Sequence, residues 1–427
     1  MTDRYAESER MLERARATIP LGSQTFSKSM LQYPPGAAPL FLSHGQGART
    51  VDVDGNEYID LVCGLAAVLL GHRDPDVDAA VVAQLSRGVT LSLPTCLEAE
   101  VAELIVDAVP CAEQVRFGKN GSDATAAAVR LARAHTGRDH VAVCGYHGWQ
   151  DWYIGSTTRH LGVPEATRAL THAFAYGDSA GLEALLRQHA VAAVVMEPMN
   201  VVEPPPGFLP RVRELCTRQG ALLVFDETVT GFRFDVGGAQ ALFGVTPDLA
   251  TFGKGLANGM PLSAVVGPTA LMAGMERIFF STTFGGEALS LAAARAVLQK
   301  LRREPVVAAL RARGEQLLAG CNARIAANGL GGTLRTSGHP SWSFLVFEPT
   351  GRYSVLELKT LFLQECFRRG VLTLGTHNIC HALGEADVAE VLRAYDEVFA
   401  ELRAALDRDD LRSRLRCPPL QPVFAVR

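Results

Sequence analysis

The sequence lacks any continuous apolar segment of the ~18 residues that a membrane-spanning helix needs, although 48% of its 427 residues are hydrophobic. Its amino terminus, Met1-Thr2-Asp3-Arg4, is charged and does not resemble a signal peptide. We therefore expect a cytoplasmic protein without a membrane partner. Positive and negative charges nearly balance, with a formal net charge of -4, so the chain has no general attraction to nucleic acid.

Disulfide and metal motifs are also missing. The nine cysteines are scattered between Cys63 and Cys417 without a Cys-x-x-Cys pair, which indicates neither a disulfide framework nor a zinc ribbon. His377 and His381 could lie one helical turn apart, but no acidic or cysteine partner near them completes a metal pattern. We expect no metal site and a small molecule as the partner.

Apolar runs alternate with helical stretches over the middle of the chain. This alternation is typical of βα units and predicts an α/β fold with a mostly parallel sheet. The clearest runs are residues 141–144, 191–196, 221–225 and 263–266.

The pattern changes after about residue 303. Residues 341–347 alternate between apolar and polar side chains, and the last helix carries an apolar stripe between residues 388 and 402. This change predicts a smaller α+β domain at residues 303–427. The large domain is expected at 61–302, and residues 1–60 are expected to pack with the small domain.

Two chemically important residues follow apolar runs. The run 221–225 ends in Asp226, and the segment that starts at Asp248 leads into Lys254. Ligands of open α/β sheets bind outside the carboxyl ends of the strands. A lysine amine and a buried aspartate there are what pyridoxal 5'-phosphate (PLP) requires, for a Schiff base and for pairing with the pyridinium nitrogen. A single lysine after a strand is usually solvated, so the combination carries the hypothesis.

A third segment has the composition of an anion site. Gly121 and Ser122 follow the predicted strand 114–117 and open an alanine-rich helix. The backbone N–H groups at such a helix start can bind phosphate, although an ordinary capped helix has the same composition. Lys119 is the alternative amine, but its position among the residues of the anion site makes it the poorer Schiff-base candidate.

Aromatic and acidic side chains follow two other strands. Tyr146, Trp149 and Trp152 come after the run 141–144 and can stack on a flat ring, or they can close the edge of the domain. Glu197 comes after the run 191–196 and is either directed into the crevice or solvated.

Together these motifs resemble class III aminotransferases, and in particular the branch of glutamate-1-semialdehyde aminomutase. The resemblance implies a fold-type I PLP-dependent transferase, with a large domain around a seven-stranded, mostly parallel sheet and a smaller α+β domain. It also implies a homodimer with shared active sites. The motifs that carry it are Gly121-Ser122, Tyr146-His147-Gly148, Glu197-Pro198, Asp226-Glu227, Thr230-Gly231-Phe232-Arg233 and Lys254-Gly255.

The resemblance implies roles for matching positions. Lys254 would be the Schiff-base lysine, Asp226 the partner of the pyridine nitrogen and Tyr146 the residue that stacks on the ring. Gly121 and Ser122 would bind the phosphate.

Further positions around the cofactor follow from the same resemblance. Thr283 would reach the phosphate from the other subunit. The remaining cofactor-binding residues would be His147, Glu197, Asn200 and Thr228.

The departures from the family concern the substrate. The aminomutase has an Asn-Ser-Pro-Val-Arg element near its amino terminus, whose arginine holds the substrate carboxylate, whereas this chain has Lys28 at the end of the segment 23–28. Lysine lacks the planar fork that matches a carboxylate. In addition, Thr228 replaces the usual Val or Ile, and Glu287-Ala288 replaces the common Asn-Pro.

These departures favour an aminotransferase that moves an amino group from L-glutamate to an aldehyde or ketone. The expected acceptor is sugar-like or a secondary metabolite, as for the aminoglycoside-type aminotransferases of antibiotic biosynthesis. An aminomutase or an epimerase uses the same lysine and is the alternative. A non-catalytic binding protein with this fold is a third hypothesis.

Overall fold

The strands in the middle of the chain form the framework of one of two structural units. The structure, a computed structural model, describes residues 4–422. One unit comprises residues 75–307, and the other combines residues 4–74 with residues 308–422.

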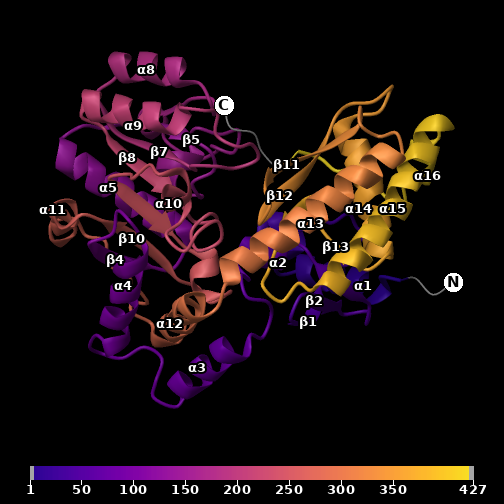
Figure 1. The fold of residues 1–427 in the computed structure, drawn as a ribbon, viewed down its shortest axis with the longest axis horizontal. Coiled ribbons are helices and arrows are strands. Elements are labelled where there is room, and N and C mark those ends of the chain that lie inside the picture. Colours follow the sequence, from indigo (N-terminus) through magenta and orange to yellow (C-terminus); the bar gives the residue numbers. More distant parts are fainter. Residues whose placement is uncertain (1–3, 423–427) are drawn as a thin grey trace. The chain divides into compact units, whose positions relative to one another are not determined.

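The unit of residues 75–307 contains all seven strands of the main sheet, of which Figure 1 labels β4, β5, β7, β8 and β10. Its elements are α3 (Pro75–Leu85), α4 (Cys96–Ala108), β4 (Gln114–Gly118), α5 (Gly121–Thr136), β5 (His140–Cys144), α6 (Asp151–Ile154), α7 (Glu165–Arg168), β6 (Thr171–Ala173), α8 (Ser179–Gln188), β7 (Val191–Met196), α9 (Phe208–Gln219), β8 (Leu222–Asp226), α10 (Ala239–Phe243), β9 (Leu249–Phe252), η3 (Lys254–Ala257), β10 (Ser263–Gly267), α11 (Thr269–Met272), η4 (Ala273–Glu276) and α12 (Ala288–Arg303).

The order of the strands in this sheet is β4-β10-β9-β8-β7-β5-β6. The five strands from β9 to β6 are parallel, whereas β10 is antiparallel to both of its neighbours. Because two antiparallel pairings restore the original direction, β4 points the same way as β9. The prediction of a seven-stranded, mostly parallel sheet is confirmed, and six strands end at the same edge.

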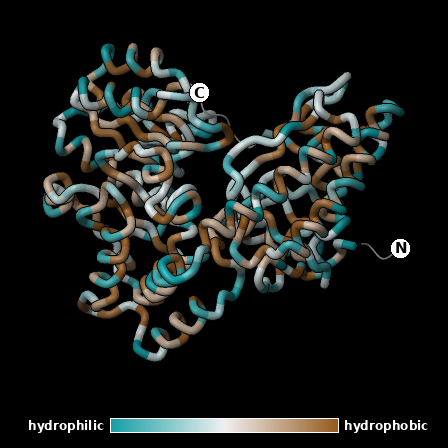
Figure 2. The backbone as a smooth tube through the Cα atoms, viewed as in Figure 1, coloured by the Kyte–Doolittle hydropathy of each residue, from teal (hydrophilic) through white to brown (hydrophobic). Residues whose placement is uncertain are grey.

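Both faces of the sheet are covered. Val141 and Val143 of β5 belong to the hydrophobic cluster that contains α5, whereas Ala142 and Cys144 belong to the cluster that contains α8 and α9. Since successive side chains of a strand point to opposite faces, a strand between two helical layers must be apolar throughout. In Figure 2 the central strands carry much of the brown that marks hydrophobic residues. Each fully buried Val or Leu contributes about 1.5–3 kcal/mol.

The second unit contains two smaller sheets, with strand orders β1-β2-β3-β13 and β11-β12-β14. Its elements are α1 (Ala6–Arg16), η1 (Pro20–Gly22), η2 (Phe26–Lys28), β1 (Leu42–Gln46), β2 (Arg49–Asp52), β3 (Glu57–Asp60), α2 (Cys63–Ala66), β11 (Leu334–His339), β12 (Trp342–Phe347), α14 (Val355–Arg368), β13 (Val371–Leu372), β14 (Thr376–Asn378), α15 (Glu385–Asp407) and α16 (Leu411–Arg414), while α13 (Val306–Ala327) begins in the first unit.

The apolar stripe of the last long helix is buried, as its spacing predicted. Along α15, Val388, Val391, Tyr395, Val398 and Phe399 are all inaccessible to solvent. Among residues 4–422, no helix is both long enough and apolar enough to cross a membrane.

Candidate active site

Residues at or just beyond the ends of five strands bring polar side chains to one edge of the main sheet. Ser122 follows β4, His147 follows β5 and Glu197 follows β7. Asp226 is the last residue of β8, and Lys254 follows β9. These strands share one direction, so their carboxyl ends form the edge at which α/β proteins bind ligands.

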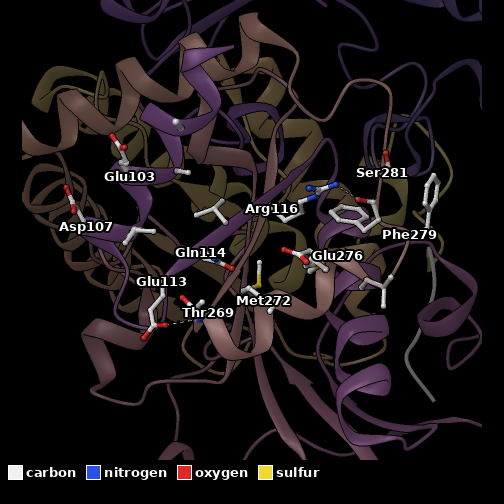
Figure 3. A pocket seen from close by; sticks show the side chains of 18 residues that line it. Glu103, Asp107, Glu113, Gln114, Arg116, Thr269, Met272, Glu276, Phe279 and Ser281 are labelled. Atoms are coloured by element: carbon white, nitrogen blue, oxygen red, sulfur yellow. Dashed lines mark hydrogen bonds between the residues drawn. The ribbon is translucent and has the colours of Figure 1, made fainter. Parts of the chain in front are cut away.

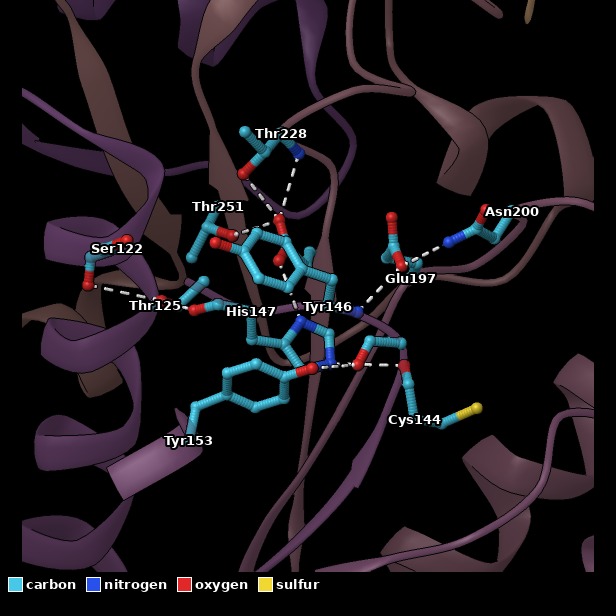
Figure 4. Close-up of polar contacts among 12 residues, drawn as sticks. Ser122, Thr125, Cys144, Tyr146, His147, Tyr153, Glu197, Asn200, Thr228 and Thr251 are labelled. Atoms are coloured by element: carbon cyan, nitrogen blue, oxygen red, sulfur yellow. Dashed lines mark hydrogen bonds and ion pairs between the residues drawn. The ribbon is translucent and has the colours of Figure 1, made fainter. Parts of the chain in front are cut away.

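Asp226 is buried and fully engaged in hydrogen bonds, and its partners His147, Thr228 and Thr251 are labelled in Figure 4. Its Oδ2 lies 2.8 Å from His147 Nδ1. Its Oδ1 accepts hydrogen bonds from Thr228 N at 3.1 Å, Thr228 Oγ1 at 2.5 Å and Thr251 Oγ1 at 3.3 Å. Burial alone would raise the pKa of Asp226, but the bonds from His147 and Thr228 outweigh it and lower the pKa below its usual value. Asp226 is therefore ionised at neutral pH.

His147 is held by contacts at both ring nitrogens. Nδ1 lies 2.8 Å from Asp226 Oδ2, and Nε2 lies 3.1 Å from the backbone carbonyl oxygen of Cys144. The ring itself is buried. The result is a buried, hydrogen-bonded pair of side chains at the centre of the site.

The neighbouring acid, Glu227, has a structural role. It is fully buried and accepts hydrogen bonds from Thr230 Oγ1 at 2.8 Å and from the backbone N–H groups of Ala239 and Gln240 at 2.5 and 3.0 Å. Burial raises the pKa of Glu227, although these bonds lower it in part. The side chain thus ties the start of α10 to the end of β8.

Lys254 lies partly buried at the start of η3, with a backbone φ of +45°. This left-handed conformation costs a residue with a Cβ atom about 1–3 kcal/mol and is found most often at functional sites. Burial lowers the pKa of its amine below the usual lysine value, although the charges of Glu197 and Asp226 act in the opposite direction. A lysine with a lowered pKa is a better nucleophile and base at neutral pH.

Glu197 is buried, so the alternative of a solvated glutamate was wrong. Its Oε2 accepts hydrogen bonds from Tyr146 N at 3.0 Å and from Asn200 Nδ2 at 2.6 Å. Burial and the charge of Asp226 raise its pKa. Gly145 (φ +111°) passes so close that a Cβ atom there would lie 2.5 Å from Glu197 Oε2. Glu197 therefore orients the segment that carries Tyr146.

Gly121 and Ser122, the residues of the predicted anion site, open α5 in the structure. Asn120 and Asp123 form a capping box, which leaves the backbone N–H groups of Gly121 and Ser122 at the first turn of a 16-residue helix. Gly148 (φ +104°) passes over this turn, where a Cβ atom would lie 2.2 Å from Ser122 Oγ. Only glycine permits this close approach.

The aromatic residues divide into exposed and buried ones. Tyr146 is 48% exposed, and Tyr153 meets its ring edge-on at 5.7 Å between centroids. Trp149 is 67% exposed, whereas Trp152 is buried in the hydrophobic cluster below the sheet edge. Of the three predicted aromatic residues, Tyr146 and Trp149 are therefore exposed, whereas Trp152 is part of the core.

Lys119 and Thr283 are the remaining residues considered from the sequence. The Lys119 amine lies 3.0 Å from Glu287 Oε2, so it is occupied in an ion pair, in agreement with its lower rank as a Schiff-base candidate. Thr283 lies in the exposed turn before α12.

Sequence reasoning missed three supporting residues. Thr251 donates to Asp226, Thr125 Oγ1 donates to the backbone oxygen of His147 at 2.9 Å, and the Tyr153 hydroxyl donates to the backbone oxygen of Gly145 at 2.7 Å. Each sits within a strand or helix, where nothing in the local sequence distinguishes it from a packing residue.

The fold and this edge of the sheet define a PLP-dependent enzyme of the α/β type. The family model described as Aminotransferase class-III matches residues 32–384. The chain therefore belongs to the class III aminotransferases.

Individual proteins agree with this assignment. The chain is 33% identical over 415 residues to 3-aminobutyryl-CoA aminotransferase of Cloacimonas acidaminovorans (strain Evry), covering 94% of this chain and 99% of that protein. It is 40% identical over 334 residues to glutamate-1-semialdehyde 2,1-aminomutase of Roseiflexus castenholzii (strain DSM 13941 / HLO8), covering 73% and 76%. The PLP internal aldimine form of the FumI protein of Sphingopyxis sp. MTA144 matches with a TM-score of 0.86 and 31% identity, covering 94% and 97%.

The side chains at the sheet edge fit this cofactor. An ionised, buried carboxylate suits a protonated pyridine nitrogen, and the helix start beneath Gly148 suits a phosphate. The amine of Lys254 has the lowered pKa that covalent attachment of an aldehyde needs. The predictions of an enzyme and of PLP as its cofactor are confirmed.

Proposed function

We propose that the chain is a transaminase that moves an amino group from L-glutamate to an aldehyde or ketone of a sugar-like or secondary-metabolite acceptor. The observation that carries the transaminase assignment is the amine of Lys254, with its lowered pKa, after the end of β9. It lies next to the strand β8, whose last residue Asp226 pairs with His147.

The roles proposed for the cofactor site follow from the contacts above. Lys254 would hold PLP covalently, Asp226 would pair with its pyridine nitrogen, and Tyr146 would stack on its ring. The backbone N–H groups of Gly121 and Ser122 would bind the phosphate. Bound PLP supplies an electron sink that stabilises negative charge on the carbon next to the nitrogen.

Other residues would hold the cofactor-binding residues in position. His147 and Thr228 keep Asp226 ionised by donating hydrogen bonds to it. Glu197 and Asn200 fix the segment of Tyr146. Lys254 Nζ, once released, would accept the proton from the substrate carbon, since burial lowers its pKa.

The acceptor proposal rests on the amino-terminal segment. Within its own unit, this segment lines a hollow of about 500 Å³ together with apolar side chains such as Leu12 and Phe41. Its polar lining includes Ser23, Gln24 and Lys28, and none of the described lining residues is an arginine. A lysine cannot match a carboxylate with two parallel hydrogen bonds, which supports an acceptor without a recognition carboxylate.

The aminomutase is the second candidate, because a relative with 40% identity bears that name. An aminomutase returns the substrate's own nitrogen, whereas a transaminase takes nitrogen from the donor. We would supply ¹⁵N-labelled L-glutamate with the unlabelled acceptor and analyse the product by mass spectrometry. Labelled product supports the transaminase, and unlabelled product supports the mutase.

A homodimer with shared active sites is part of the proposal. Thr283 lies between Phe279 and Phe284, which are 83% and 56% exposed. Phe279 also lines a hollow of about 930 Å³ beside α4 and β4 (Figure 3). Exposed large apolar side chains around Thr283 support an interface there, through which Thr283 would reach the partner's phosphate. Light scattering on the purified protein measures the oligomeric state, and Thr283→Ala should weaken PLP binding.

The test of the proposed function uses Lys254→Ala. The wild-type protein should show the visible absorbance of lysine-bound PLP, and L-glutamate should convert it to the pyridoxamine form. The alanine variant should lose both signals while keeping its circular dichroism spectrum. An alanine variant that remains coloured and active would show that another amine, such as that of Lys119, holds the cofactor.

A further inference from the structure

Three histidines from separate elements gather at the edge of the main sheet opposite to the active site. His140 is the first residue of β5, His172 lies in β6 and His189 follows α8. Their rings contact one another pairwise, with centroids 5.1 Å apart for His140 and His172, 4.8 Å for His140 and His189, and 4.0 Å for His172 and His189. All three side chains are partly buried.

The ring nitrogens converge. One nitrogen from each histidine lies within 4.8 Å of the other two, and His140 Nδ1 lies 2.9 Å from His172 Nε2. In a tetrahedral zinc site with Zn–N bonds of about 2.0–2.1 Å, the ligand nitrogens are about 3.3 Å apart. The 2.9 Å separation and the 4.8 Å limit bracket this value, so the three nitrogens are close enough to share one ion once the stacked rings of His172 and His189 reorient.

The three side chains offer ligand atoms of one kind. Imidazole nitrogen is a ligand that suits zinc and similar divalent transition metal ions. Aminotransferase chemistry at the other edge makes no use of these side chains, because β5 separates His140 from the segment of Tyr146 and His147.

We propose that His140, His172 and His189 form a binding site for Zn²⁺ or a similar divalent transition metal ion. Three imidazoles would occupy three positions of a tetrahedron, and water would take the fourth. Since β6 is the edge strand of the sheet, the ion would tie β6 to β5 and to the end of α8. The proposal does not depend on the substrate of the enzyme.

The test is a titration of Zn²⁺ into untagged, EDTA-treated holoenzyme, followed by isothermal calorimetry. We expect one tight site for each chain. His172→Ala and His189→Ala should each weaken it by about 100-fold or more, because even losing a partner outside the ligand set costs about 10–100-fold. His135→Ala is the matched control, since His135 is an exposed histidine of α5 in the same unit.

Two further measurements separate metal binding from folding. Zn²⁺ should raise the melting temperature of the wild type by a few degrees, since a ligand at 100 times its Kd stabilises the folded state, and His189→Ala should lose this rise. The variant should retain aminotransferase activity within about twofold, because His189 lies outside the catalytic edge. Zinc affinity that is equal in all variants, or no binding at a Zn²⁺ excess, would overturn the proposal.

Discussion

His147 Nδ1 lies 2.8 Å from Asp226 Oδ2, and this pair joins two strands that are not neighbours. His147 follows β5 and Asp226 ends β8, while β7 lies between them in the sheet. The pair is almost inaccessible to solvent. A buried carboxylate needs hydrogen bonds to offset the loss of hydration, and here His147, Thr228 and Thr251 provide them. These hydrogen bonds, which depend on the fold, therefore keep Asp226 charged.

Asp226→Asn should reduce kcat by about 100-fold or more, the usual cost of removing one preorganised electrostatic partner. The amide keeps the shape and an oxygen for Thr228 but loses the charge that would pair with the pyridine nitrogen. The measurement is the rate of the half-reaction with L-glutamate, followed by absorbance.

The adjacent Glu227→Gln is the matched control. Glu227 bonds the start of α10, so its amide should lower the free energy of unfolding by about 1–3 kcal/mol, with a smaller effect on the half-reaction. If Glu227→Gln slowed the half-reaction more than Asp226→Asn did, and Asp226→Asn lost more stability, the roles assigned to the two acids would be wrong.

Gly148→Ala should weaken PLP binding at least about tenfold, because a Cβ atom 2.2 Å from Ser122 Oγ must displace the phosphate site. Titration of the apoenzyme with PLP measures the effect. Gly137→Ala provides the comparison: Gly137 also has a positive φ, of +67°, but no atom lies within 4 Å of a Cβ atom there. Gly137→Ala should lower the free energy of unfolding by about 1 kcal/mol and leave the affinity for PLP unchanged.

Glu197→Gln should stabilise the apoenzyme at neutral pH. Burial raises the pKa of Glu197 above its ordinary value of 4.5, so the folded state binds this proton more tightly than the unfolded state. The wild type therefore loses stability as the pH rises from 4.5 through the raised pKa. Glutamine keeps an oxygen for Tyr146 N and Asn200 Nδ2 but does not titrate.

Melting temperatures of both apoenzymes between pH 4 and pH 8 test this expectation. The difference between variant and wild type should grow with pH. A difference that is constant across the range would show that Glu197 does not have a raised pKa.

The acceptor can be tested by a screen of aldehydes, amino-sugar ketones and glutamate semialdehyde. We expect turnover with a neutral or cationic hydroxyl-rich carbonyl, because Tyr146 and Trp149 offer exposed aromatic faces and a good cation–π contact contributes about 0.5–2 kcal/mol. Efficient use of glutamate semialdehyde alone would refute the inference drawn from the missing arginine.

Local sequence determined the strands and the chemistry at their ends. The runs that became β5, β7, β8 and β10 are apolar at nearly every position, and such runs form strands covered on both faces. Their predicted bounds agree within one residue. The positions of Asp226 and Lys254 at strand ends followed from the same local pattern, as did the glycine-rich start of α5.

Only the tertiary structure decided which way side chains face and which distant residues meet. Asp226 and Glu227 are adjacent acids, yet one belongs to the site and the other bonds α10. Glu197 is buried because Gly145 and Tyr146 pack over it. The three histidines at the opposite edge come together because β6 pairs with β5 and α8 ends beside them. Such contacts depend on strand order and on the course of each loop, and residue periodicity within a single segment carries no information about either.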